Sequence, residues 1–408
     1  MTTVRQLPTP LVVLLASQFA FNVGFYLVVP FLAAHLSGDL HLAGWVVGAI
    51  LGLRTVSQQG LFVWGGAAAD RWGARRSIVV GCVIRIAGFL TIAVTTSVAG
   101  VITGVLLIGV AAAVFSPATE SAIVAWGQHL ERRGGPTLTD VVAIENICSK
   151  AGSVCGPVLG GVLLVVPFST TCFLAAVVFG LVLAAHLTIP TTSHTASLRH
   201  PIRTSLLAVI HDRPFLTFTL IHSSYLLAYN QLYLAAPVEL TRLGLPPAAI
   251  TWLFVLAAVV TILGQVPVTR AARPWGRATT MRRGYLLISI GFVTVACGTP
   301  FTDRHGWGVA PLLLFVLLLH LGQMLLLPAA RDVIADLSGG RHLGTYLGLS
   351  ASVGGLAVLV GSTLNGHLLD LATTPTWTAP IPWLIAAIPT ALSAITITPF
   401  TRHHLPPP

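Results

Sequence analysis

Residues 65–77 read GGAAADRWGARRS and lie between two long apolar runs. Four of the seven residues from Asp70 to Arg76 are charged, whereas only 8% of the 408 residues in the whole chain are charged. A soluble domain usually has about 25% charged residues. The chain is also 55% hydrophobic, with a mean hydropathy of +0.86. Such a composition cannot supply the polar surface of a soluble globule, so it predicts a membrane protein in which residues 65–77 form a polar connection.

Twelve long apolar runs are separated by charge, glycine or proline, and a membrane-spanning helix needs about 20 such residues. We expect spans at 11–34, 44–66, 77–97, 100–121, 139–164, 168–188, 214–238, 248–269, 284–300, 308–330, 342–367 and 380–399. The first run is longer than the apolar region of a signal peptide, about 7–15 residues, and is expected to be retained. The predicted fold is therefore an all-α membrane protein with twelve transmembrane helices in two six-helix halves.

The basic residues predict the orientation of these spans. With the N-terminus inside, the inner segments hold 17 of the 22 Lys and Arg residues and the outer loops hold two, Arg242 and Arg304. Arg54, Arg85 and Lys150 remain inside spans. An inner excess of basic residues is the usual orientation signal of membrane proteins. We therefore expect a multi-pass protein of the bacterial cytoplasmic membrane with both termini in the cytoplasm, and we expect the net charge of +10 to face lipid rather than nucleic acid.

The longest internal connection, at about 189–213, divides the twelve runs into six and six. We expect an N-terminal half at 1–190, a cytoplasmic linker with a short amphipathic helix at 191–213, and a C-terminal half at 214–408.

Weak internal similarity supports this division. The stretch FSPATESAIVA at 115–125 resembles LLPAARDVIAD at 326–336, and DRWGARR at 70–76 has an echo in ARPWGRATT at 272–280. Both copies of each pair are expected to face the cytoplasm. This pattern fits a parallel repeat about an axis along the membrane normal, as in transporters built from two halves.

The loop at 65–77 resembles a signature of the major facilitator superfamily, G-x-L-x-D-R-x-G-R-[RK], between the second and third helices. The matching positions are Gly66, Asp70, Arg71, Gly73 and Arg75. Ala68 and Ala74 depart from the pattern. The resemblance implies that the charged residues of this loop stabilise the outward-facing state through contacts between the halves. We add three residues near the inner ends of spans four and ten as candidate inner-gate partners, namely Glu120, Arg331 and Asp332.

A second signature lies in span five, where GSVCGPVLGG at 152–161 fits G-x-x-x-G-P-x-x-G-G. The fixed positions are Gly152, Gly156, Pro157, Gly160 and Gly161. In the superfamily this pattern marks proton-coupled drug antiporters, although glycine-rich helix packing is the structural alternative. The stretch 52–89 also resembles twelve-helix bacterial multidrug-resistance exporters. The resemblance implies proton-coupled efflux of small amphipathic compounds by alternating access; a facilitator or a proton symporter for a small nutrient is the alternative.

Two expected features of such antiporters are absent. Span four lacks the Arg of an R-x-x-x-G pattern, and span one has no acidic residue. Proton coupling therefore has to be sought in other ionisable groups at membrane depth, which are functional candidates by default. Our proton-coupling candidates are Glu145, Lys150, His222 and His320. A structural ion pair of Glu145 with Arg85, and hydrogen-bonded histidines, are the structural alternatives.

Polar and aromatic residues at similar depth are candidates for contact with substrate, with packing against neighbouring side chains as the alternative. The substrate-binding candidates are Asn22, Tyr26, Arg54, Gln58, Arg85 and Tyr229. The sequence has no H-E-x-x-H, no G-x-S-x-G and no paired intramembrane aspartates, and its five cysteines lack metal-ligand spacing. We therefore expect no enzymatic activity, no metal and no cofactor. The expected partners are a small-molecule substrate, protons and the lipid bilayer, and we expect a monomer.

Overall fold

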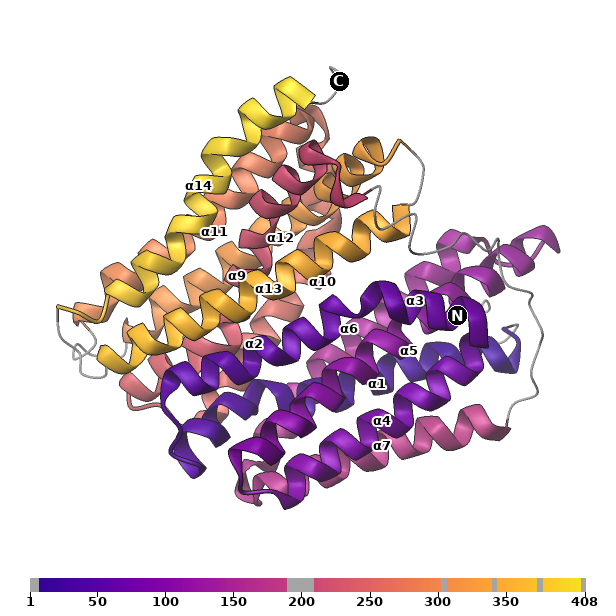
Figure 1. Cartoon of the computed structure of the whole chain (residues 1–408), viewed down its shortest axis with the longest axis horizontal. Coiled ribbons are helices and arrows are strands. Elements are labelled where there is room, and N and C mark those ends of the chain that lie inside the picture. Colours follow the sequence, from indigo (N-terminus) through magenta and orange to yellow (C-terminus); the bar gives the residue numbers. More distant parts are fainter. Residues whose placement is uncertain (1–6, 189–208, 302–306, 340–342, 373–376, 405–408) are drawn as a thin grey trace. The chain divides into compact units, whose positions relative to one another are not determined.

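The computed structural model describes residues 7–188, 209–301, 307–339, 343–372 and 377–404 (Figure 1). Within these ranges every regular element is a helix. The chain divides into two compact units. Unit 1 takes residues 1–30 and 61–200, and unit 2 takes residues 31–60 and 201–408.

Long helices build both units. Unit 1 contains most of α1 (Thr9–Ala34), with α3 (Phe62–Trp72), α4 (Ala74–Val94), α5 (Val98–Arg132), α6 (Leu138–Val162) and α7 (Phe168–Thr188). Unit 2 contains the π-helical turn η2 (His35–Asp39), α2 (Gly44–Gly60), α9 (Arg213–Arg242), α10 (Ile250–Ala272), α11 (Gly276–Gly298), α12 (Ala310–Leu337), α13 (Leu343–Leu371) and α14 (Ile381–His404). Short 3-10 turns are η3 (Leu163–Val165), η4 (Pro247–Ala249), η5 (Arg273–Trp275), η6 (Thr299–Phe301) and η7 (Trp307–Val309). Each predicted run coincides with a helix, except that the run at 44–66 is broken at Leu61 into α2 and α3.

Ten segments of the described residues are long and apolar enough to cross a membrane. One of them is a continuous stretch of 52 residues that contains both α10 and α11. The remaining long helix, α9, is rich in buried polar side chains, namely Thr219, Ser223, Ser224, Asn230, Gln231 and Glu239. Polar side chains inside a span lower its hydropathy and face protein rather than lipid. The predicted all-α membrane fold is confirmed.

Unit 1 has an aromatic core between α1, α4, α5 and α7. Phe21 stacks on Phe115 with ring centroids 4.1 Å apart, and Phe179 lies 5.4 Å from Phe21 and 5.7 Å from Phe89. Each of these rings is at most 5% exposed. Stacked and tilted phenyl pairs at these distances stabilise a core beyond the burial of their area.

The loop between α3 and α4 consists of one residue, Gly73. This glycine has φ 82° and ψ 154°, and its backbone N–H closes α3 by donating to the carbonyl of Ala69. Gly276, the first residue of α11 after η5, has φ 70° and ψ 160°. Both glycines follow a tryptophan, Trp72 and Trp275. The shared and unusual backbone conformation supports the similarity seen between these two stretches in the sequence.

In unit 2, α2 packs antiparallel along α13 (Figure 1). Three α2 residues four positions apart lie against the α13 backbone: Gly44 against Gly366, Gly48 against Ser362, and Gly52 against Leu359. A methyl group on Gly48 would lie 2.1 Å from the carbonyl oxygen of Ser362, so the backbones touch directly. Glycine at helix contacts permits this close approach in membrane proteins. We call this contact the α2–α13 seam.

The α2–α13 seam means that the compact units differ from the predicted halves, because α2 comes from the first half of the sequence. The organisation into halves at 1–190 and 214–408 stays a prediction. Most of the predicted linker at 191–213, including its proposed amphipathic helix up to 208, lies outside the described residues. Where the description resumes, Asp212 caps α9 by accepting a hydrogen bond from the N–H of Phe215 at 3.0 Å.

Candidate transport site

The glycine signature at 152–161 lies where α6 packs on α1 in unit 1. A Cβ atom on Gly152 would lie 2.4 Å from the carbonyl oxygen of Phe19, and one on Gly156 would lie 2.6 Å from Cβ of Tyr26. Gly160 is buried and Gly161 half-buried, while Pro157 lies inside α6, which continues through it. The signature therefore forms a close helix contact, and two predicted substrate residues, Asn22 and Tyr26, lie directly against it.

Glu145 lies at the same α1–α6 contact, about two turns before Gly152 on α6. Gln18 Nε2 donates a hydrogen bond of 2.6 Å to Glu145 Oε1. Asn22 Nδ2 donates to the carbonyl of Gln18 at 2.8 Å and to Ser149 Oγ at 3.2 Å. Glu145 and Asn22 are both half-buried. Glu145 and Asn22, predicted independently, are therefore brought into one polar cluster by neighbouring turns of α1 and α6.

Lys150, the second proton-coupling candidate on α6, is half-buried, and its ammonium makes no hydrogen bond or ion pair within the described residues. Its side chain lies five residues from Glu145 on the same helix, which places the two about 140° apart around the axis. Lys150 and Glu145 therefore do not share one face of α6.

Arg85 lies in the aromatic core of unit 1 and is 1% exposed. Its guanidinium lies 5.3–5.9 Å from the ring centroids of four phenylalanines, namely Phe25, Phe89, Phe115 and Phe179. Nη1 donates a hydrogen bond of 2.6 Å to the carbonyl of Ile108 on α5. A guanidinium over aromatic faces gains cation–π stabilisation away from water. This environment favours a structural role for Arg85; its predicted ion pair with Glu145 stays a prediction.

Arg54 belongs to α2 and therefore to unit 2. It is 7% exposed, and its guanidinium donates to Gln58 Oε1 at 3.3 Å and to Thr55 Oγ1 at 3.2 Å. Gln58 and Arg54 are one turn apart on α2, which explains why the two predicted substrate residues meet. All three side chains come from one helix.

Two further candidates, His222 and Tyr229, belong to a row of aromatic residues on α9 that are spaced by three or four positions. Its members are Phe218, His222, Tyr225, Tyr229 and Tyr233, with successive ring centroids 5.7–6.3 Å apart. His222 Nδ1 lies 3.0 Å from the hydroxyl of Tyr285 on α11. His320 on α12 lies 6.0 Å from the ring of Tyr229, and its Nδ1 is 2.8 Å from the carbonyl of Val316. The predicted residues His222, Tyr229 and His320 are thus brought together in unit 2.

Residues 65–77 form the end of α3, the single loop residue Gly73 and the start of α4, and Arg75 holds this stretch within unit 1. Arg75 donates from Nε to the carbonyl of His186 at 2.6 Å and from Nη2 to the carbonyl of Leu187 at 2.7 Å. Arg75 therefore binds the last carbonyls of α7, where a cation is favoured by the helix dipole. Arg71 is exposed, and the side chain of Asp70 lies outside the described residues. The contact between halves implied for this loop stays a prediction.

The charges expected near the inner gate are exposed. These are Glu120 on α5 and Arg331 and Asp332 on α12. In unit 2, Arg277 pairs with Asp336 instead. The repeat places Arg277 opposite Ala74, and Asp336 opposite Ala125. The charge that the signature loses at Ala74 is therefore present in the second copy, together with a carboxylate partner.

Comparison with known proteins places this arrangement in a family. The family model described as Major Facilitator Superfamily matches residues 14–315 and 232–408. The chain belongs to the major facilitator superfamily.

Curated relatives of this superfamily member cover most of its length. An uncharacterised MFS-type transporter of Mycobacterium tuberculosis is 34% identical over 370 residues, or 88% of this chain and 86% of the relative. The multidrug resistance protein MdtH of Yersinia enterocolitica is 26% identical over 375 residues, or 92% of this chain and 90% of the relative. This major facilitator is therefore a membrane transporter and not an enzyme.

Solved structures of other transporters share the fold. The nucleoside transporter NupG has a TM-score of 0.79 at 14% identity and covers 96% of this chain and 99% of its own. An auto-inhibited peptide transporter of the POT family has a TM-score of 0.78 at 14% identity, with 98% of each chain covered. At this identity the likeness establishes the shared fold.

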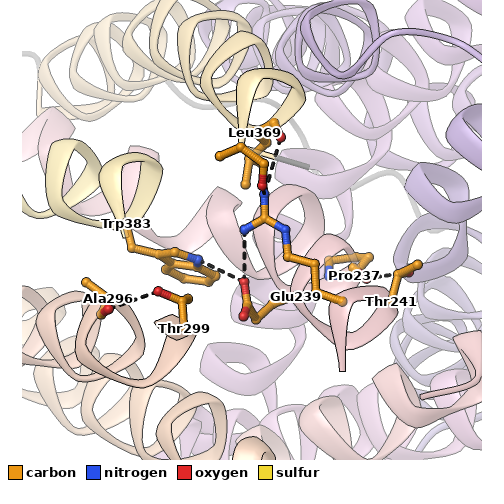
Figure 2. Close-up of polar contacts among 9 residues, drawn as sticks. Pro237, Glu239, Thr241, Ala296, Thr299, Leu369 and Trp383 are labelled. Carbon is orange, nitrogen blue, oxygen red and sulfur yellow. Dashed lines mark hydrogen bonds and ion pairs between the residues drawn. The ribbon is translucent and has the colours of Figure 1, made fainter. Parts of the chain in front are cut away.

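One buried ion pair of this transporter is missing from the candidates. Figure 2 shows Glu239 of α9 beside Trp383 of α14, and Glu239 also pairs with Arg242 of its own helix. Arg242 Nη1 lies 3.3 Å from Glu239 Oε2, and Trp383 Nε1 donates to the same oxygen at 3.2 Å. The i, i+3 spacing of Glu239 and Arg242 is the sequence signal that could have found this pair. The predicted span ends at 238 and Arg242 is assigned to an outer loop, so this pair is expected outside the membrane-spanning segment.

Proposed function

We propose that this transporter exports small amphipathic compounds across the bacterial cytoplasmic membrane against an inward flow of protons, by alternating access as a monomer. Two observations support the proposal. The glycine pattern of proton-coupled drug antiporters lies at the α1–α6 contact, and a relative with 26% identity over 92% of the chain is named a multidrug resistance protein.

The observation that carries proton coupling is the hydrogen bond between Glu145 and Gln18. Within the described residues, Glu145 Oε1 accepts this hydrogen bond from a neutral amide. An amide group has both a donor and an acceptor end. By turning, Gln18 can donate to the ionised carboxylate and accept from the protonated acid. The cluster therefore accommodates both protonation states of Glu145, as a proton carrier requires.

The proposed substrate class follows from the other candidates. Arg54 and Lys150 place cations in spans that hold few carboxylates, which favours compounds with an acidic or zwitterionic group. The aromatic row on α9 offers apolar faces with polar tips at His222 and Tyr229. Together these groups fit compounds that combine an aromatic body with an anionic or zwitterionic end.

The test uses proteoliposomes with an imposed pH gradient and a trapped pH-sensitive dye. A panel of cationic, zwitterionic and anionic antibiotics is added to wild-type protein and to Glu145→Gln. The matched control is Glu131→Gln, because Glu131 is an exposed glutamate at the end of α5. We expect zwitterionic and anionic compounds to collapse the gradient with the wild type and the control, and the response to fall at least tenfold in Glu145→Gln, as loss of an essential proton carrier does.

Other results would change the proposal in defined ways. An equal response from wild type and Glu145→Gln would leave antiport in place but exclude Glu145 as the carrier, and Lys150, His222 and His320 would then be tested in the same assay. A substrate that enters vesicles together with protons would support the alternative, a symporter for a small nutrient. No proton movement with any compound would contradict coupled efflux.

A further inference from the structure

The last turn of α13 makes polar contacts with two other helices of unit 2. The carboxylate of Asp370 accepts hydrogen bonds from the backbone N–H groups of Gly44 at 2.7 Å and Trp45 at 3.2 Å, where α2 begins. Arg242 Nη2 donates to the carbonyl oxygens of Leu369, at 3.3 Å, and Ala372. One turn of α13 is therefore held by α9 and itself holds α2.

The charges match the helix ends that they contact. Asp370 places an anion at the N-terminus of α2, and Arg242 places a cation at the C-terminus of α13, as the helix dipoles favour. Glu239 accepts hydrogen bonds from Arg242 and from Trp383. Glu239 and Trp383 (Figure 2) are 3% and 1% exposed. Charge-assisted hydrogen bonds removed from water are strong and directional. The direction of Arg242 is therefore set by the packing of α9 and α14.

The contact of Asp370 lies at one end of the α2–α13 seam. Gly44 is the first residue of α2 and also the first glycine of the seam, where a Cβ atom would lie 2.6 Å from both Asp370 Oδ1 and the carbonyl of Gly366. The chain continues from α2 through Leu61 into α3, which belongs to unit 1. A movement of α2 with the helices that follow it has to open the seam and break the two hydrogen bonds of Asp370.

We propose that Asp370 is a latch that holds α2 on α13, and that Arg242 and Glu239 are positioning residues for this latch. The latch sets how readily the seam opens. Its role in transport rests on the alternating access proposed above, because each cycle of that mechanism separates parts of the first sequence half from the second. Opening of the seam itself can be measured without substrate or protons.

The test measures the distance across the seam by electron paramagnetic resonance. The five native cysteines are replaced, and spin labels are attached through Trp45→Cys on α2 and Leu371→Cys on α13, which are 50% and 69% exposed in the native chain. Asp370→Asn, Arg242→Gln and Arg242→Lys are then compared in this labelled background. The matched control is Asp39→Asn, because Asp39 is an exposed aspartate of η2 near the beginning of α2 and bonds His35 rather than α13.

We expect a longer-distance population to grow about fivefold in Asp370→Asn, as loss of one charge at a helix end predicts. Arg242→Gln should give the same shift, and the double variant should give no more than either single variant, because both act on one contact. Arg242→Lys should be intermediate, because lysine keeps the charge without the fork that spans two carbonyls. The control should match the parent protein.

An unchanged distance distribution in Asp370→Asn would overturn the latch. A change in Asp370→Asn without one in Arg242→Gln and Arg242→Lys would overturn the positioning role of Arg242. An equal change in the Asp39→Asn control would show a general loosening and also overturn the proposal. If the seam responds as expected while no compound moves protons in the vesicle assay, the efflux proposal fails and the latch stands.

Discussion

At the scale of single residues, Gly73 has a backbone conformation that only glycine adopts without strain. Its φ of 82° and ψ of 154° lie in a region where a side chain costs about 1–3 kcal/mol. We expect Gly73→Ala to lower the free energy of unfolding in detergent by this amount, measured by thermal unfolding followed through tryptophan fluorescence. The cost should arise from the backbone alone, because no atom lies within 4 Å of an added Cβ.

The chain offers a matched control for this change in the same signature. Gly66 lies inside α3 without a positive φ, and it too has no atom within 4 Å of an added Cβ. Alanine is the better helix former, so Gly66→Ala should leave stability unchanged or raise it slightly. Equal unfolding temperatures for Gly73→Ala and Gly66→Ala would contradict the conformational explanation of this loop.

At the scale of helices, the α2–α13 seam depends on glycine because the two backbones touch. A methyl group on Gly48 would lie 2.1 Å from the carbonyl oxygen of Ser362, and this backbone atom cannot move without moving α13. We expect Gly48→Ala to destabilise the protein by about 1–3 kcal/mol, the usual cost of overpacking a tight contact. The measurement is thermal unfolding in detergent, combined with the proton-flux assay.

Gly60 provides the control on the same helix. A Cβ atom there would meet only Val56 Cγ1 at 3.8 Å, which is ordinary van der Waals contact. Gly60→Ala should therefore behave like the wild type in both measurements. If Gly48→Ala also unfolds like the wild type, α2 does not lie against α13 as described.

The positions of the helices were predictable because each span must present a long apolar surface to lipid. Their ends were less predictable: α5 continues to Arg132, beyond the predicted end at 121, because a helix can extend past the membrane into water. The α2–α13 seam could not be predicted from one sequence. The spacing of Gly44, Gly48 and Gly52 marks a close helix contact but carries no information about the partner helix.

The same limit applies to the candidate site. Glu145 could be found because a carboxylate inside an apolar run stands out, but its contact with Gln18 joins residues 127 positions apart. The sequence does not identify Glu239 and Arg242 as a buried pair. They lie at the end of α9, where hydropathy does not distinguish a buried pair from a polar loop. Their importance arises from Trp383 and the end of α13, which only the fold brings near.

At the scale of the whole molecule, the distribution of arginine predicts an orientation in the membrane. The 17 to 2 division of basic residues between predicted inner and outer segments predicts a cytoplasmic N-terminus and C-terminus. The test again uses a chain without native cysteines, in intact cells treated with a membrane-impermeant maleimide. Trp377→Cys, at an 87% exposed position before α14, should be labelled, because this loop is predicted to lie outside.

The decisive comparison is with Arg133→Cys, an exposed position in the connection between α5 and α6 that is predicted to lie inside. It should react only after the cells are opened. The reverse labelling pattern would show the opposite membrane orientation. The α2–α13 seam would then open on the opposite side of the membrane. Since Asp370 and Trp377 lie seven residues apart at the same end of α13 and α14, labelling of Trp377→Cys from outside would place the proposed latch at the outer mouth of the transporter, where a compound leaving the cell has to pass.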